Sequence, residues 1–347
     1  MTDVPFKKYS KSSGFYTKTH KEFFTENESL LAKIEEHNRI YREQPVREYC
    51  KLCHEKLPTL KDLVSHDIPY FFCSNCGHFN GAYEDTKEFV KKIYLEDTNY
   101  SDHYVNAEFD SRTKNIYVPK VDFLAENLPP GIRPRVLDIG CGSGNFVYAC
   151  LQRDIEAVGI DFSAKAVDFG NQQIRQRLNK SPLTLVSEET FFQSIVGSDA
   201  SVLSAIGVLE HLREPDKLFD AFEKSRMTYL FYSVPMFSAS VIFENAFPAV
   251  FPRQLGGDHT HLFTESSVEW MHKNKNLCSL AEWRFGTGVM DLYRSLLITL
   301  KKNGASDKLL KIFEEGFAQK IDALQAVLDK NNFCSEIHCL VKKERMS

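Results

Sequence analysis

The sequence has no long uninterrupted apolar segment. No apolar run approaches the roughly 18 residues that a membrane-spanning helix needs. Residues 1–16 also lack the apolar core of a signal peptide. We therefore expect a soluble, cytoplasmic protein without a membrane segment.

An excess of positive charge is missing as well. The chain has 43 Lys and Arg residues against 47 Asp and Glu residues, a formal net charge of −4. Nucleic-acid-binding proteins usually concentrate basic residues on one surface. The short basic stretches at residues 90–92 and 341–345 are typical of ordinary solvated faces. A small-molecule partner is expected, and a nucleic-acid partner is not.

The chain contains no internal repeat and no low-complexity segment, and its cysteines do not form a disulfide pattern. Four of the nine cysteines have metal-ligand spacing. The other five are scattered through apolar surroundings: Cys141, Cys150, Cys278, Cys334 and Cys339. This usage favours a reducing compartment over a disulfide framework.

Two Cys-x-x-Cys pairs, separated by 19 residues, predict a zinc ribbon. They are Cys50 with Cys53 and Cys73 with Cys76. Each pair can turn both thiolates toward one tetrahedral Zn²⁺ ion, and four thiolates leave no open position for catalysis. A structural zinc that supplies folding free energy is therefore expected. The alternatives are four free thiols, a redox pair, or substitution of a ligand by His54 or His78.

Changes in composition divide the chain into four parts. We expect a polar arm and a helix capped at Asn27 over residues 1–45, the ribbon over 46–80, a helical and tyrosine-rich linker or lid over 81–130, and a larger domain over 131–347. In the last part, apolar strand patterns alternate with helical patterns. Strands are expected at residues 135–140, 155–161, 183–187, 200–209, 227–235, 279–286 and 335–344. This alternation predicts an α/β fold, with a parallel sheet and helices on both faces.

A helical insertion of about 289–332 separates the last two predicted strands. Its apolar residues recur every three or four positions: Leu309, Leu310, Phe313, Phe317, Ile321, Leu324 and Leu328. One continuous apolar face of this kind packs into a core or forms a dimer surface. The chain is accordingly expected to be a monomer or a homodimer.

A glycine-rich turn follows the first predicted strand of the large domain, in the stretch VLDIGCGSGNF at residues 136–146. Glycines allow positive φ and a close approach of the backbone to a ligand. The G-x-G-x-G spacing differs from the dinucleotide fingerprint G-x-G-x-x-G/A. The next strand ends at Asp161, 21 residues after Gly140, where a carboxylate can accept hydrogen bonds from a ribose diol or cap the following helix.

Three stretches together resemble the class I S-adenosylmethionine-dependent methyltransferases: VLDIGCGSGNF at 136–146, VGIDFS at 158–163 and AIGVLEHL at 205–212. The resemblance is close over residues 135–233 and loose beyond them. It implies a Rossmann-like sheet of seven strands in which the last strand is reversed. It also implies S-adenosyl-L-methionine (SAM) as the cofactor.

The same resemblance implies roles for particular residues. Four would line the methionine end of the cofactor: Asp138, Gly140, Gly142 and Gly144. Asp161 would bind the ribose, Phe162 would lie along the adenine, and Ser187 or Glu188 would contact the adenine N6. Glu210 would anchor the cofactor site. Asp138 could instead hold the glycine loop by bonding its amides.

With the ribbon added, the chain resembles a branch that methylates deoxysugars attached to nucleotides. The stretches that carry this likeness are NYSDHY at 99–104 and GGDHTHLFTESS at 256–267. The chain differs from the sugar C-methyltransferases in two ways. It lacks their large additional C-terminal domain, and the surroundings of its histidines differ from theirs. The nucleophilic atom of the acceptor is therefore left open.

Methyl transfer to a hydroxyl or a carbon acid needs a general base near the operating pH. The candidate catalytic residues are His261, His259, His211, Tyr100 and Tyr104, with Asp258 able to orient an imidazole. Each could instead be a packing or surface residue, and an anionic acceptor would need no base. We predict methyl transfer to a small polar acceptor, a sugar or a sugar nucleotide. The alternatives are an RNA or protein methyltransferase whose ribbon recognises the substrate, and an inactive cofactor-binding scaffold.

Overall fold

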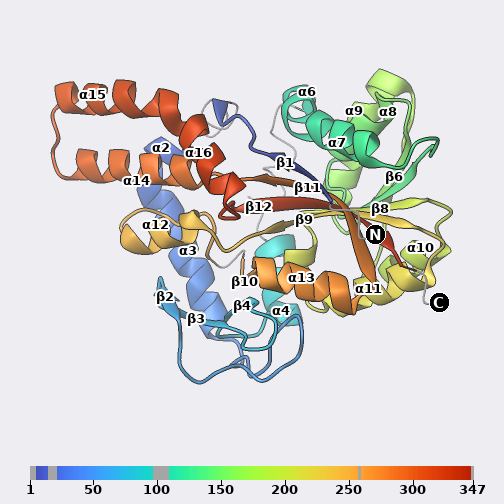
Figure 1. Ribbon diagram of the computed structural model, residues 1–347, viewed down its shortest axis with the longest axis horizontal. Coiled ribbons are helices and arrows are strands. Elements are labelled where there is room, and N and C mark those ends of the chain that lie inside the picture. The colour runs from blue at the N-terminus through green and yellow to red at the C-terminus, as the bar shows by residue number, and fades with distance from the viewer. Residues whose placement is uncertain (1–4, 15–21, 97–108, 257–258, 345–347) are drawn as a thin grey trace.

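A mixed sheet forms the centre of the fold in the computed structural model, which describes residues 5–14, 22–96, 109–256 and 259–344. Within these residues the sheet has eight strands (Figure 1). In order across the sheet they are β1 (Phe6–Tyr9), β11 (Leu277–Phe285), β12 (Glu336–Lys343), β9 (Tyr229–Pro235), β8 (Val202–Ile206), β5 (Arg135–Ile139), β6 (Glu156–Asp161) and β7 (Leu183–Leu185).

The pairing of these strands confirms the predicted α/β class. β5 to β9 pair in parallel, and β12 runs antiparallel to both of its neighbours, β9 and β11. The reversed last strand is therefore present. The sheet has one strand more than the seven expected, because β1 pairs in parallel with β11. The predicted polar arm thus contributes an edge strand to the large sheet.

Helices cover both faces of the sheet (Figure 1). One face carries α6 (Phe109–Arg112), α7 (Val118–Asn127), α8 (Asn145–Leu151) and α9 (Ala164–Leu178). The other face carries α10 (Glu188–Gly197), α11 (Pro215–Lys224) and α13 (Glu265–Asn274). Two apolar clusters fill the space between the helices and the sheet, one on each face.

Local signals in the sequence explain where α9 begins and ends. The Ser163 hydroxyl accepts a hydrogen bond from the Ala166 amide and caps the first turn. Asn179 adopts the left-handed conformation that commonly ends a helix.

A smaller sheet lies in the segment of the cysteine pairs, and the second pair falls between two of its strands. Its strands, in order, are β10 (His261–Leu262), β4 (Phe79–Gly81), β3 (Ile68–Phe72) and β2 (Leu63–Ser65). Helix α3 (Asn27–Arg42) packs on this sheet through Ile40 and Tyr41. The cap of α3 is Glu26, not Asn27 as expected. The Asn27 side chain instead accepts a hydrogen bond from the Phe251 amide, which ties the helix to a distant loop.

The ribbon is not a separate unit, because β10 comes from the second half of the chain. β10 pairs antiparallel with β4, matching His261 with Asn80 and Leu262 with Phe79. The Gly81 amide also donates to the Thr260 carbonyl oxygen at 2.8 Å. The smaller sheet is therefore completed by the segment that carries two of the three predicted catalytic histidines, His259 and His261.

Most of the remaining elements belong to the segment between the two sheets or to the helical insertion. The former contains α4 (Lys87–Val90), the π-helical turns η1 (Lys91–Glu96) and η2 (Thr113–Tyr117), and helices α6 and α7. The others are α2 (Glu22–Thr25), α12 (Ala239–Ala246), α14 (Gly288–Lys302), α15 (Asp307–Phe317) and α16 (Ile321–Lys330), with 3₁₀ turns at η3 (Leu209–His211) and η4 (Ala318–Lys320). In the described part of the chain, no helix combines the length and apolar character required to cross a bilayer.

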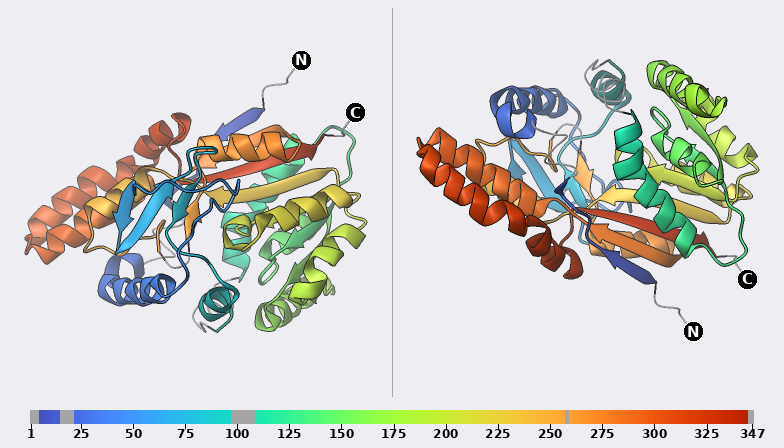
Figure 2. Two further views of the ribbon diagram at one scale, coloured as in Figure 1. Left: turned by 90° about the horizontal axis from the view of Figure 1, so that it is seen from below. Right: turned by 90° about the horizontal axis from the view of Figure 1, so that it is seen from above.

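The insertion α14–α16 extends from one end of the molecule, away from α8 and α9 at the other end (Figures 1 and 2). Tyr293 of α14 stacks on Phe313 and Phe317 of α15, with ring centroids 5.4 and 5.8 Å apart. The predicted single apolar face is only partly buried, since Leu309 and Leu324 are 47% and 44% exposed. The turn η4 lies between α15 and α16, so the predicted apolar face extends over two helices.

Candidate active site

The carboxyl ends of β5, β6 and β8 form the candidate active site. β5 lies between β8 and β6 in the sheet. From β5 the chain continues to β6 and β7 on one side, and then crosses to β8 and β9 on the other side, so the strand order reverses at β5. Open α/β sheets bind ligands at such a reversal, outside the carboxyl ends of the strands. Three segments converge here: the glycine loop after β5, Asp161 and Phe162 at the end of β6, and Glu210 and His211 after β8.

The glycine loop turns sharply between β5 and α8. Gly140, Gly142 and Gly144 have φ values of 61°, 52° and 73°, which side chains rarely adopt. A Cβ atom on Gly144 would lie 2.6 Å from Cδ1 of Leu183. Asn145 then holds the start of α8, because its side-chain amide donates hydrogen bonds to the Phe109 carbonyl oxygen and to Oγ1 of Thr113.

Asp161 connects the loop to the end of β6. Its two carboxylate oxygens accept hydrogen bonds from the amides of Gly142 and Ser163, at 2.7 and 2.8 Å. Burial raises the pKa of Asp161, and these amide bonds oppose that shift. Each oxygen keeps a further lone pair for a hydroxyl donor. The loop-holding role considered for Asp138 thus belongs to Asp161.

Asp138 is buried in the sheet below the loop. It accepts a hydrogen bond of 2.6 Å from the Ser204 hydroxyl of β8. Burial raises its pKa to about 7, since a carboxylate in this position has lost its water. A cationic group bound at the loop would favour the ionised form. This is the environment expected beside the ammonium group of an amino-acid ligand.

The expected adenine contacts differ in how well they fit. Phe162 is 40% exposed and its ring centroid lies 4.9 Å from that of Phe191, so part of the ring remains open to a ligand. Ser187 is exposed at the start of α10, and its hydroxyl donates to a carboxylate oxygen of Glu189. Glu188 pairs with Lys87 of α4 at 2.6 Å. An adenine contact from Ser187 or Glu188 therefore stays a prediction.

Glu210, His211 and His259 come together at the edge of the site. One carboxylate oxygen and one ring nitrogen of each histidine all lie within 4.8 Å of one another. The two imidazole rings stack with centroids 5.6 Å apart and planes inclined by 25°. Glu210 is only 6% exposed, and burial raises its pKa to about 8. Each of these residues was a candidate site residue in the sequence, but their proximity to one another was not predicted.

His261 is placed differently from the other candidate bases. It is 1% exposed and has both ring nitrogens in hydrogen bonds, one to Nε2 of His78 at 2.8 Å and one to the Glu210 carbonyl oxygen at 3.0 Å. Burial lowers its pKa well below the usual value. These contacts favour a positioning role over that of a general base. Tyr100, Tyr104 and Asp258 lie outside the described residues.

The four ribbon cysteines form a compact cluster, with all sulfurs within 4.8 Å of one another. The sulfurs of Cys50 and Cys76 are 3.6 Å apart, and those of Cys53 and Cys73 are 3.4 Å apart. A tetrahedral zinc with bonds of about 2.3 Å would separate its sulfurs by roughly 3.8 Å, so the cluster fits this ion. His54 is bonded instead to Asp216, at 2.6 Å.

The cysteine cluster is joined to the candidate active site by hydrogen bonds. The Thr264 hydroxyl donates to the Gly77 carbonyl oxygen, directly after the second cysteine pair. His78 then reaches His261, whose other nitrogen holds the backbone of Glu210. The ribbon therefore fixes the position of the histidine segment and of the turn after β8.

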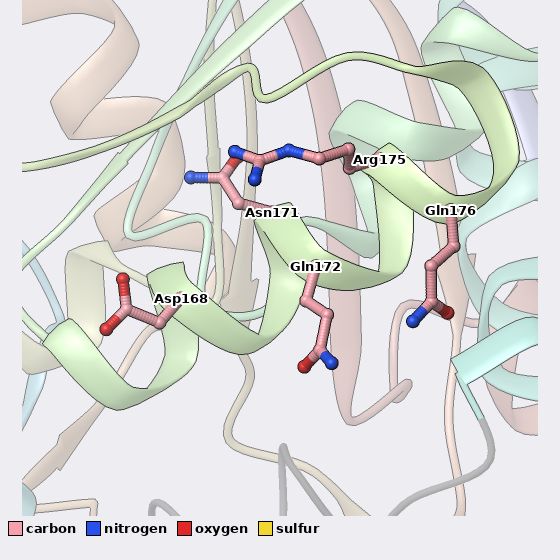
Figure 3. A pocket seen from close by; sticks show the side chains of 5 residues that line it. All are labelled: Asp168, Asn171, Gln172, Arg175 and Gln176. Carbon is pink, nitrogen blue, oxygen red and sulfur yellow. The ribbon is translucent and has the colours of Figure 1, made fainter.

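A shallow depression of about 330 Å³ lies elsewhere, along the outer face of α9 (Figure 3). One helix supplies its lining residues: Asp168, Asn171, Gln172, Arg175 and Gln176. Arg175 bonds to the Ser181 hydroxyl, and the Asn171 side chain bonds to the backbone of Leu183. These side chains stabilise the end of α9 and the following strand, and we assign no binding role to the depression.

Comparisons with known proteins identify a methyltransferase domain in this part of the chain. Residues 137–225 match the family model of a methyltransferase domain. No curated protein matches the chain. The matched residues include the glycine loop, Asp161 and the Glu210–His211 turn.

Several solved methyltransferase structures are similar in part. Magnesium protoporphyrin IX methyltransferase from Synechocystis PCC 6803, with bound SAH, is 13% identical with a TM-score of 0.46, over 75% of this chain and 100% of that one. A SAM-dependent methyltransferase from Archaeoglobus fulgidus is 16% identical with a TM-score of 0.41, over 70% and 97%. The chain is an enzyme with a methyltransferase domain at residues 137–225, as the glycine loop and the stretches after it predicted.

Proposed function

We propose that the enzyme transfers the methyl group of SAM to a small polar acceptor, a sugar or a sugar nucleotide, in the cytoplasm. The observation that carries this proposal is the meeting of His211 and His259 beside the glycine loop. Imidazoles suit the removal of a proton near neutral pH, as a hydroxyl acceptor requires. The net charge of −4 is consistent with a small acceptor and gives no support to a nucleic-acid substrate.

The residues around the loop fit the parts of SAM. The buried Asp138 would face the ammonium end, and Asp161 would accept the ribose hydroxyls while it holds the Gly142 amide. The exposed part of the Phe162 ring would lie along the adenine. SAM, when bound, supplies an electrophilic methyl group on a positively charged sulfur.

The protein's own contribution is positioning and proton removal. The loop and Asp161 would fix the cofactor, while the turn after β8 and the segment before β10 would hold the acceptor in line with the methyl group. His211 or His259 would accept the proton that leaves an acceptor hydroxyl. His261 would keep this arrangement in register through its bond to the Glu210 carbonyl oxygen.

We further propose that the four cysteines hold a structural Zn²⁺ ion. Four thiolates complete a tetrahedral shell and leave no position for a substrate. The ion would stabilise the smaller sheet, in which β10 is an edge strand. It would thereby act on catalysis through the placement of His259 and His261.

A transfer assay tests the proposed function. Methyl-labelled SAM is incubated with the purified enzyme and with separate small-molecule and polymer fractions of a cell lysate. We expect label in the small-molecule fraction, and loss of that label with Asp161→Ala. Label confined to RNA or protein would contradict the acceptor class, and SAM binding without transfer to any fraction would contradict the proposed activity.

A further inference from the structure

We propose that Glu210, His211 and His259 form a binding site for a divalent transition-metal ion, distinct from the four-cysteine site. The ligand atoms come from two segments of the chain, the η3 turn after β8 and the residues before β10. They all lie within 4.8 Å of one another. An ion with bonds of about 2.1 Å to nitrogen and oxygen would draw such atoms to roughly 3–4 Å apart, which side-chain rotations can supply.

An unpartnered oxygen atom of Glu210 gives the second observation. Glu210 is only 6% exposed, and its buried Oε2 atom has no hydrogen-bond partner among the residues that the structure describes. Buried side-chain oxygen atoms nearly always have a hydrogen-bond partner in native structures, so an unsatisfied one calls for an explanation such as an absent ion. A cation held with the two imidazoles would satisfy this oxygen.

The surroundings of His259 also suit a metal ligand. Nδ1 of His259 lies 3.2 Å from the Gln254 carbonyl oxygen, which can only accept a hydrogen bond. We therefore assign the proton to Nδ1, which leaves the lone pair on Nε2. Metal-binding histidines commonly donate their other ring N–H to a backbone carbonyl in this way.

The Gln254 backbone is itself held in place. Its amide donates to Oε1 of the buried Glu244, at 2.8 Å, and its side chain donates to the Ser335 carbonyl oxygen. On the other side, His261 holds the Glu210 carbonyl oxygen. The two segments that supply the ligands are thus fixed independently of any ion, as a preformed site requires.

The ligand set indicates which ions would bind. Two imidazoles and one carboxylate suit Mn²⁺, Fe²⁺, Co²⁺, Ni²⁺ or Zn²⁺, whereas Mg²⁺ and Ca²⁺ prefer sites made of oxygen alone. Three protein ligands also leave coordination positions open. An acceptor with two adjacent oxygens, such as a sugar diol, could occupy two of them.

The role of the ion rests on the proposed function. With the ion bound, His211 and His259 would act as its ligands and not as the base. An acceptor hydroxyl bound to the ion would have a lowered pKa, so that its proton passes to water at neutral pH. The oxygen would then form a bond to the methyl carbon while the carbon–sulfur bond breaks. The sulfur keeps the electron pair and becomes neutral, so charge and atoms balance.

Manganese binding tests the site without SAM or acceptor. Full-length protein with zinc in the cysteine site is freed of other metals and titrated with Mn²⁺, and free Mn²⁺ is measured by electron paramagnetic resonance. Hard Mn²⁺ competes poorly for four thiolates. We expect one Mn²⁺ per chain, and at least tenfold weaker binding in Glu210→Gln and in His259→Ala.

Glu214→Gln is the matched control, because Glu214 is four residues from Glu210 but exposed and paired with Lys217. It should bind Mn²⁺ as the natural protein does. If Glu210→Gln fails to fold, the partly exposed His259→Ala carries the comparison. Absence of a Mn²⁺ equivalent in the natural protein, or unchanged affinity in the folded variants, overturns the site. Mn²⁺ binding without methyl transfer would overturn only the proposed function.

Discussion

The close approach of α9 to the glycine loop leads to a prediction opposite to that of helix propensity. Gly170 lies inside α9, where alanine would normally stabilise a helix by about 1 kcal/mol. A Cβ atom at this position would lie 2.4 Å from the Ser143 carbonyl oxygen and 2.5 Å from Cδ1 of Leu183. Contacts under 3.0 Å are essentially never observed, so the loop would have to move by at least about 0.6 Å.

Overpacking of this kind costs about 1–3 kcal/mol. After the gain in propensity, Gly170→Ala should lower the free energy of unfolding by about 0–2 kcal/mol. The displaced loop should also bind SAM roughly tenfold more weakly, a loss of about 1.4 kcal/mol. Urea unfolding measures the first quantity, and titration calorimetry with SAM measures the second.

Gly316→Ala provides the control, because Gly316 lies inside α15 and a Cβ atom there would have open space around it. This variant should gain about 1 kcal/mol of stability and bind SAM normally. If Gly170→Ala were stabilised to the same extent and kept its SAM affinity, the proposed steric conflict with the loop would be refuted.

Three further substitutions separate the roles assigned above. Cys73→Ser should lose the bound zinc and about 4 kcal/mol or more of stability, as metal analysis and urea unfolding would measure. The control Cys278→Ser, at an exposed cysteine, should change neither quantity. A Cys73→Ser protein that folds normally and loses only activity would contradict a structural zinc. Burial raises the pKa of Asp138 to about 7, so between about pH 4 and pH 7 the native state holds a proton on this carboxyl that the unfolded state has lost. The free energy of unfolding should therefore fall by at most about 4 kcal/mol as the pH rises through that interval. Asp138→Asn should remove this slope, and equal slopes in both proteins would argue against the buried carboxyl. Asp161→Ala should weaken SAM binding by roughly 10–100-fold in a protein with an unchanged circular dichroism spectrum, because hydrogen bonds to a charged group contribute about 1.5–3 kcal/mol each.

The sequence was sufficient to predict the elements that depend on local signals. The limits of α9 follow from Ser163 and Asn179, and the start of α8 at Asn145 follows from the glycine turn. The buried strands carried clear apolar runs. The order of the strands came from resemblance, since apolar patterns alone do not say which strands pair.

The shortest strands could not be predicted, because partners far along the chain stabilise them. β1 has four residues, including Lys7 and Lys8, and pairs with β11 more than 270 residues away. β10 has two residues and forms only because β4 is beside it. The meeting of His211 and His259 has the same cause. Each was a plausible base, but only the packing of the ribbon against the large sheet brings them together.

The strand β1 has a consequence for the solubility of the protein. Without it, β11 would present the unpaired backbone of Ala281–Arg284 at the rim of the sheet, beside the apolar ring of Trp283. Such a rim readily recruits a strand from another molecule and starts aggregation. β1 is short and carries Lys7 and Lys8, so the edge strand of the sheet is charged and not apolar. A few residues at the start of the chain thereby protect the enzyme from pairing with itself.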